Sequence, residues 1–121
     1  MTLKILPDGF SVCRLASGTK IDLTKEFSFA AHTDRELSLV CRTQDVPAGT
    51  EIREDGWRGF RIEGVLDFSL VGILSGISSV LAETGTGLFA VSTYDTDYIF
   101  VKEENLDRAR LALQAAGYEF V

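Results

Sequence analysis

The sequence predicts an α+β fold in which two helices pack on one sheet. Apolar residues recur at helical spacing from Leu70 to Leu81. Two short apolar runs, Leu88–Val91 and Tyr98–Val101, flank a polar turn, which is typical of a hairpin. A second helical pattern follows over 103–117. The order from Phe60 to Val121 is therefore strand, helix, strand, strand, helix and strand, the ferredoxin-like arrangement.

The composition of the chain excludes several classes of function. The 121 residues suffice for one domain or two very small ones that share a core. The net charge of −6 argues against binding to nucleic acid, which requires clustered Lys and Arg. No apolar run is long enough for a signal peptide or a membrane span, so we expect a cytoplasmic protein. Cys13 and Cys41 lie in strand-like runs without metal-ligand spacing, which predicts buried thiols, no metal and no cofactor.

The first half predicts two hairpins. Apolar runs over Leu3–Leu6 and Phe10–Leu15 flank Pro7-Asp8-Gly9, a sequence typical of a turn. Two further strands, Phe27–Thr33 and Glu36–Arg42, follow.

The rest of this half is expected to be irregular. We expect one short helical turn over Ile21–Glu26. Pro47 and Gly49 interrupt the pattern, and the polar segment Glu51–Gly59 is predicted to be a connector.

The helices of the second half have clear boundaries. Ser69 is a favourable N-cap residue for the first helix, and Gly85 is expected to end that helix. Acidic residues near Glu103 suit the positive start of the second helix, and Gly117 closes it. The hairpin strands carry apolar residues on both faces, so we expect the first half, or a second copy of the chain, to cover the face away from the helices.

The two halves resemble each other. Phe29-Ala30-x-x-Thr33 recurs 60 positions later as Phe89-Ala90-x-x-Thr93. After one inserted residue, Leu37, Leu39 and Val40 correspond to Tyr98, Phe100 and Val101. We interpret this pattern as two tandem ferredoxin-like βαββαβ units, 1–58 and 59–121, of which the first has shortened helices.

The start of the first predicted helix is a candidate binding site. Free backbone N–H groups over Leu70–Ile73 attract an anion such as a carboxylate. Gly72 allows a ligand to approach the backbone, and Asp67 could bind an ammonium group. The alternative is that Gly72 and Gly76 only permit close helix packing, and that Asp67 is a solvated loop residue.

The hairpin turn Ser92–Asp97 is a second candidate. Its hydroxyls and carboxylates suit an amine or guanidinium group, although Asp and Thr are also frequent in ordinary turns. We reject Asp95 and Asp97 as an acid–base pair, because no nucleophile, metal-ligand set or histidine is near them in sequence. His32 is the only histidine and cannot form a metal site by itself. The sequence therefore predicts no catalytic residue.

Three segments resemble the small bacterial ACT-domain proteins: Asp67–Leu74, Leu88–Tyr98 and Val101–Glu104. These proteins are similar to the regulatory part of aspartate kinases and to the cytosolic arginine sensor of animal growth signalling. The resemblance covers roughly Phe60 to Gly117, and the Ser92–Asp97 run is its most specific part.

The resemblance implies ferredoxin-like units, often in tandem, that bind amino acids at interfaces between domains. Carried over by position, the ligand-binding residues are Asp67, Phe68, Gly72, Ile73, Ser92, Thr93, Tyr94 and Asp95. Val71 departs from the family pattern, in which a hydroxyl residue often precedes the glycine, so a side-chain donor is lost.

Together these observations predict a regulatory protein, expected to be a homodimer, that binds a free amino acid or a similar small zwitterion. The helix start would take the carboxylate, and Asp67 or Asp95 would take the amine. Phe68, Ile73 and Tyr94 would contact the ligand side chain. The main alternative is a ligand-free protein–protein assembly module. A small enzyme is a third possibility, but it lacks a nucleophile or base.

Overall fold

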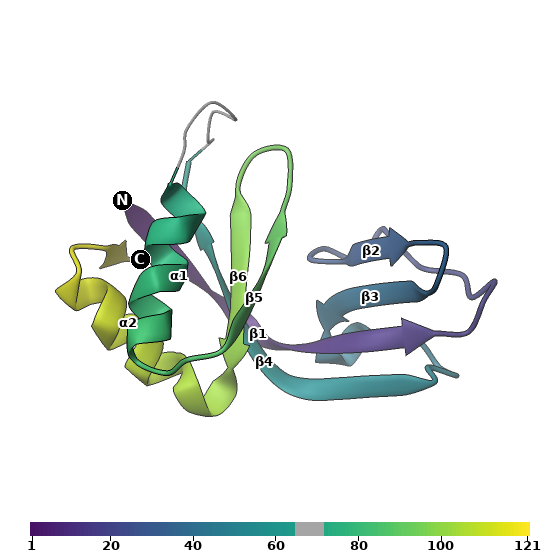
Figure 1. The fold of residues 1–121 in the computed structure, drawn as a ribbon. Coiled ribbons are helices and arrows are strands. Elements are labelled where there is room, and N and C mark those ends of the chain that lie inside the picture. Colours follow the sequence, from purple (N-terminus) through teal and green to yellow (C-terminus); the bar gives the residue numbers. More distant parts are fainter. Residues whose placement is uncertain (65–71) are drawn as a thin grey trace. The chain divides into compact units, whose positions relative to one another are not determined.

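The structure is a computed structural model of residues 1–121, and it describes residues 1–64 and 72–121 (Figure 1). The chain forms two compact units. We call Met1–Pro7 with Arg58–Val121 the helical unit, and Asp8–Trp57 the strand unit. The elements in order are β1 (Thr2–Leu15), β2 (Phe29–His32), β3 (Leu37–Arg42), η1 (Thr43–Asp45), β4 (Ile52–Ile62), α1 (Ile73–Glu83), β5 (Leu88–Ser92), β6 (Asp97–Lys102), η2 (Glu103–Asn105), α2 (Leu106–Ala115) and β7 (Glu119–Phe120).

In the helical unit, two helices pack on a sheet with the strand order β7-β1-β4-β6-β5. β5 and β6 are antiparallel, whereas β7 is parallel to β1. Figure 1 shows α1 and α2 side by side, and the two helices contact each other. The fully buried core contains Leu3, Phe60, Ile62, Ile77, Leu81, Ile99, Val101, Ala109 and Leu113. The mixed α/β class, both helices and the β5–β6 hairpin are thus confirmed.

The helix boundaries agree with the sequence where the structure describes them. Ile77 and Leu81 of α1 are fully buried, in line with the predicted apolar stripe. The helix ends before Gly85, which has a φ of +70°, the left-handed conformation that glycine adopts most readily. The predicted cap Ser69 and the apolar Leu70 lie outside the described residues.

The strand unit has the order β2-β3-β1-β4. β3 is antiparallel to both β1 and β2. Its small core consists of Cys13, Leu15, Leu39 and Cys41. Both thiols are free and buried, and desolvation raises the pKa of Cys41 to about 12.

The hairpin predicted at Pro7-Asp8-Gly9 is wrong, because β1 runs without a break from Thr2 to Leu15. Its first part bonds to the end of β4, where the Glu63 N–H donates to the Thr2 carbonyl over 2.9 Å. Proline's fixed φ is compatible with an extended strand, and Gly9 does not adopt a positive φ. The partner strand comes from distant sequence, which local turn preference does not reveal.

The polar connector predicted over Glu51–Gly59 is also wrong, because β4 occupies Ile52–Ile62. β4 is an edge strand of the strand unit, and its residues from Ile52 to Asp55 are exposed. An edge strand tolerates polar residues because one side faces solvent. No helix forms over Ile21–Glu26, where a short helical turn is expected. The segment contains one hydrogen-bonded turn, in which the Lys25 N–H donates to the Asp22 carbonyl over 3.4 Å and the Thr24 N–H to the Asp22 carboxylate over 3.0 Å.

The two hairpins share one register. Phe29 lies opposite Val40 in β2–β3, and Phe89 lies opposite Phe100 in β5–β6. Both residues of the second pair thus follow their counterparts in the first pair by 60 positions. The turn bonds correspond too. The Thr33 N–H donates to the Glu36 carbonyl over 2.9 Å, and the Thr93 N–H to the Thr96 carbonyl over 2.8 Å. The 3₁₀ turns η1 and η2 follow at the same offset. The offset is therefore constant, without the inserted residue that the sequence predicts.

Candidate functional site

The turn between β5 and β6 is fixed by its own threonines. The Thr93 hydroxyl donates to the Thr96 carbonyl over 3.0 Å, which closes the turn beside the backbone bond. Thr96 is buried, and its hydroxyl donates to the Ile62 carbonyl at the end of β4 over 2.7 Å. Tyr94 and Asp95 lie at the tip, where Tyr94 is 81% exposed. The turn is thus held against the strand that leads towards α1, with its tip residues facing solvent.

The start of α1 offers backbone donors. Gly72 has a φ of +81°, and its carbonyl accepts the first helical bond, from the Gly76 N–H, over 2.8 Å. No side chain caps this helix start in the part of the chain that the structure describes. The first amides of a helix have no partner within it and favour an anion.

A small open cavity lies beside this helix start. It has a volume of about 350 Å³, and Gly72 and Ile73 line it with Met1 and with Ala116, Gly117 and Tyr118 after α2. A Cβ atom added to Gly72 would meet no atom of the described residues within 4 Å. The helix start is therefore approachable from this side.

Six of the eight residues predicted to bind a ligand are described. Asp67 and Phe68, like Val71, lie outside the described residues. Figure 1 shows the start of α1 and the β5–β6 turn at the same end of the helical unit. The cavity at Gly72 and Ile73 has no lining residue from the turn. The structure therefore brings both segments to one end of the unit but not into one described cavity.

One charged pair at this end was not singled out from the sequence. Arg61 on β4 donates from Nε to Glu63 Oε1 over 2.8 Å. The hydrogen bond to Glu63, and then one to Tyr98 on β6, raise the pKa of the guanidinium. Both Arg61 and Glu63 keep about a third of their side-chain surface exposed, so each can contact a solute. The alternation of Arg61, Ile62 and Glu63 is the signal that places the two charges on one face.

Two features are absent from residues 1–64 and 72–121. No group of three or more His, Cys, Asp or Glu side chains in residues 1–64 and 72–121 could hold a metal ion. No helix in the same ranges is both long and apolar enough to cross a membrane.

Comparison with known families identifies the fold. The family model described as ACT domain matches residues 52–115, more than half of the chain. The chain therefore belongs to the ACT domain family. No curated protein matches it in sequence.

Solved structures extend the similarity over nearly the whole chain. Protein Atu0741 from Agobacterium tumefaciens is 31% identical, with a TM-score of 0.86 over 99% of this chain and 91% of its own. Protein VC0802 from Vibrio cholerae, a protein of unknown function described as a possible transport protein, is 21% identical, with a TM-score of 0.76 over 92% of this chain and 85% of its own.

A third solved structure has the same fold. The ligand-free regulatory subunit of aspartate kinase from Thermus thermophilus is 11% identical, with a TM-score of 0.63 over 91% of this chain and 93% of its own. At this identity the likeness shows the fold alone. The predicted resemblance to small ACT-domain proteins and to aspartate kinase regulatory domains is thus confirmed.

Proposed function

We propose that this chain is a regulatory protein that binds a free amino acid or a similar small zwitterion, in the cytoplasm and without catalytic activity of its own. The observation that carries the proposal is the ACT domain match over 52–115, which includes α1 and the β5–β6 turn. The bond from Thr96 to Ile62 supports it, because it holds the turn at the end of the unit where α1 begins.

In the proposed site, the amides at Gly72 and Ile73 receive the ligand carboxylate. Ser92, Thr93 and Asp95 provide oxygen atoms for the ammonium group, and Tyr94 covers the ligand side chain. Asp67 and Phe68 complete the site as the sequence predicts. Val71 provides no hydroxyl, so backbone donors at the helix start carry more of the carboxylate recognition.

We further propose that the chain contains two tandem ACT-like units, 1–58 and 59–121, with the first reduced. The constant 60-residue offset between the hairpins supports this architecture. The strand order β2-β3-β1-β4 also supports it, because a ferredoxin-like unit has this order. Loops 16–28 and 46–51 would then replace its two helices, and Met1–Pro7 would pack with the second unit.

A homodimer would let the ligand act as a regulator. A ligand held between ACT units shifts an equilibrium between two arrangements only by its different affinity for each. The edge strand β5 could pair with a second copy, since an edge strand presents unpaired backbone groups.

Calorimetry and thermal unfolding with each of the twenty amino acids test the proposal. A ligand that binds only the folded state raises Tm in a concentration-dependent manner. Asp95→Asn should weaken binding of the active amino acid about tenfold, the loss expected for one charge-assisted hydrogen bond. Glu104→Gln, an exposed acid in η2, is the matched control. If none of the twenty stabilises the protein, amino-acid sensing is ruled out.

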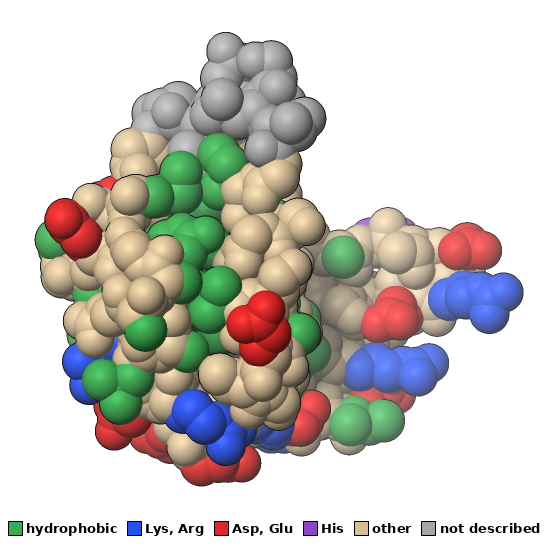
Figure 2. Space-filling model, turned by 60° about the vertical axis from the view of Figure 1, so that its left-hand side comes forward, with side chains coloured by type: hydrophobic (Ala, Val, Ile, Leu, Met, Phe, Trp, Pro, Cys, Tyr) green, Lys and Arg blue, Asp and Glu red, His purple; other side chains and the backbone are tan. Residues whose placement is uncertain are grey.

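One observation favours the second candidate, a ligand-free assembly module. Figure 2 shows apolar side chains gathered over one face of the helical unit. Leu111 is 59% exposed, and Tyr94 is more exposed still. Scattered exposed apolar residues are normal, but a contiguous patch marks an interface. This function would be supported if the protein forms an oligomer without ligand, if Leu111→Glu dissociates that oligomer, and if calorimetry detects no binding of any amino acid.

A further inference from the structure

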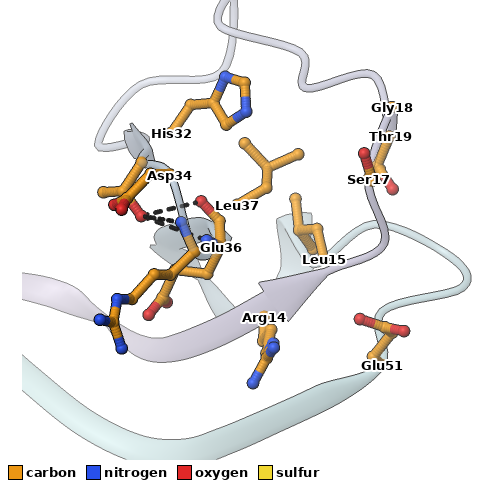
Figure 3. A pocket seen from close by; sticks show the side chains of 12 residues that line it. Arg14, Leu15, Ser17, Gly18, Thr19, His32, Asp34, Glu36, Leu37 and Glu51 are labelled. Carbon is orange, nitrogen blue, oxygen red and sulfur yellow. Dashed lines mark hydrogen bonds between the residues drawn. The ribbon is translucent and has the colours of Figure 1, made fainter.

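Two cavities of the strand unit differ in how their lining is arranged. The larger, of about 790 Å³, lies at the turn end of the unit, where β2 turns into β3. Figure 3 shows charged side chains of both signs around it. Arg14 and Leu15 are consecutive residues of β1, however, so their side chains point to opposite faces of the sheet. Its cationic and apolar groups therefore do not face one common space.

The smaller cavity, of about 310 Å³, has an apolar floor on a single face of the sheet. Leu39 of β3 belongs to the core of the strand unit and is 2% exposed. Ile21 and Val46 pack against the same core from two loops, and both line the cavity with Leu39. The volume lies at the lower end of the range of small-molecule sites.

This cavity exists because loops replace helices on that face. Leu39 lies opposite Ala30 in β2–β3, just as Ile99 lies opposite Ala90 in β5–β6, 60 positions later. Ile99 is fully buried in a core to which both α1 and α2 contribute. Over Leu39, loops 16–28 and 46–51 contribute Ile21 and Val46 instead, and the remaining space is the cavity.

Both loops are held by their own hydrogen bonds. The Thr19 hydroxyl donates to the Ala16 carbonyl over 2.6 Å, beside a backbone bond of 3.1 Å between the same residues. The Thr50 hydroxyl donates to the Pro47 carbonyl over 2.7 Å. The walls of the cavity are therefore formed before a ligand arrives, as is usual for small-molecule sites.

The two acidic side chains of the lining already have partners. Asp45 accepts a bond from Arg42 Nε over 2.9 Å, and only 10% of its side-chain surface is exposed. The Asp22 carboxylate accepts bonds from the hydroxyl and the N–H of Thr24, and these bonds, with the nearby Lys25, lower its pKa. Neither acid therefore offers an unbalanced charge to a ligand ammonium group.

Lys20, in contrast, is a cation without a counter-charge. It is exposed, lines the cavity and makes no hydrogen bond or ion pair with any residue in 1–64 and 72–121. The hydroxyl of Ser28, which also lines the cavity, has no hydrogen-bond partner in the same ranges. An ammonium group and a hydroxyl donor together suit a carboxylate.

We infer that this cavity binds a carboxylic acid that has an apolar tail and no amino group. Lys20 and Ser28 hold the carboxylate, and the tail lies on Ile21, Leu39 and Val46. At about 30 Å³ per group, the volume that one water occupies in the liquid, the cavity holds about ten non-hydrogen atoms, which is the size of octanoate. The inference concerns the strand unit alone and does not require that the site at Gly72 binds anything.

Backbone ¹H–¹⁵N spectra of the full chain, titrated with octanoate, octylamine and leucine, test the inference. The amides of Ser28 and Gln44 line this cavity, whereas Gly72 lines the one in the helical unit. We expect octanoate to shift Ser28 and Gln44 in a saturable manner, and both amines to leave them unchanged. From butanoate to octanoate, affinity should rise about fourfold for each added methylene that becomes buried.

Variants of Lys20 assign these shifts to the cavity. Lys20→Gln should weaken octanoate binding about tenfold. Lys20→Glu should admit octylamine instead, because the charge beside the apolar floor is reversed. Lys4→Gln removes an exposed cation of the helical unit and is the matched control, which should bind octanoate as the wild type does.

Three outcomes would overturn the inference. The first is that octanoate does not shift Ser28 and Gln44, and the second is that leucine shifts them as strongly as octanoate does. The third is equal octanoate affinity in the wild type and in Lys20→Gln. A response of Gly72 to an amino acid would not rescue it, because that amide reports on the proposed function alone.

Discussion

The hydroxyl of Thr96 donates to the carbonyl of Ile62 over 2.7 Å, although the two residues are 34 positions apart. The bond is buried and connects the β5–β6 turn to the end of β4. It therefore fixes the position of the turn from which the proposed site takes Ser92 to Asp95.

Thr96→Val should test this connection, because valine keeps the side-chain shape but cannot donate. The Ile62 carbonyl then loses its buried side-chain partner, which costs about 1–3 kcal/mol. Urea unfolding of both proteins measures the difference. Thr24→Val, at an exposed position, should change the free energy of unfolding by less than about 0.5 kcal/mol. A Thr96→Val protein as stable as the wild type would show that the bond contributes nothing.

Gly59→Ala should destabilise the helical unit. A Cβ atom at Gly59 would lie 2.8 Å from Cε1 of Phe100, whose ring is fully buried. Such overpacking costs about 1–3 kcal/mol. The control is Gly87→Ala, where a Cβ atom meets nothing within 4 Å and φ is not positive. Thermal unfolding should show a clear fall in Tm for the first variant only, and Phe100→Leu should partly rescue it.

The stability of the strand unit should depend on pH through Asp55. A 2.5 Å hydrogen bond from the buried Ser11 hydroxyl, and then one from Arg53, lower the pKa of this carboxyl below its ordinary value of 3.8. A lowered pKa in the folded state stabilises the fold above the ordinary value, and this stabilisation is lost as the pH falls through the folded value.

Asp55→Asn should therefore lower the free energy of unfolding at pH 7, with a difference that shrinks as the pH falls below 3.8. Urea titrations at several pH values measure it, with the exposed Glu26→Gln as the control. A difference that stays constant down to pH 2.5 would contradict the role given to Ser11.

Both thiols should resist alkylation while the protein is folded. Cys13 and Cys41 are almost fully buried, and desolvation is the largest cause that raises the pKa of each. Only the thiolate reacts with iodoacetamide. At pH 8 we expect labelling at least about a hundredfold slower than in urea, because the ordinary thiol pKa is about 8.5. Mass spectrometry follows the labelling, and rapid modification of the native protein would contradict the buried placement.

Local sequence predicts the helical unit well. The stripe from Ile73 to Leu81 and the hairpin runs at Leu88 and Tyr98 need only their neighbours in sequence to reveal their period. The polar run Ser92–Asp97 also predicts the β5–β6 turn. The attachment of this turn to Ile62, and the Arg61–Glu63 pair beside it, could not be predicted, because both depend on contacts between strands.

The strand unit was predicted less well for the same reason. Pro7-Asp8-Gly9 has the residues of a turn, but the chain continues because Thr2 pairs with Glu63 and Glu119 rather than with the residues after Gly9. The segment Glu51–Gly59 shows the same limit. Its polar residues predict a connector, but it forms most of the edge strand β4. The preference of a short segment is weak compared with a ladder of backbone hydrogen bonds.

The sequence by itself determined the two helices and the β2–β3 and β5–β6 hairpins, because these depend on spacing along the chain. Its motifs also indicated the family, and the resemblance to that family predicts the residues of the proposed site. Only the tertiary structure decided that β1 and β4 are long strands, that both hairpins share one register and that a charged cavity lies at the end of the strand unit. Those features depend on which distant backbone groups become partners, and a linear pattern does not specify that choice.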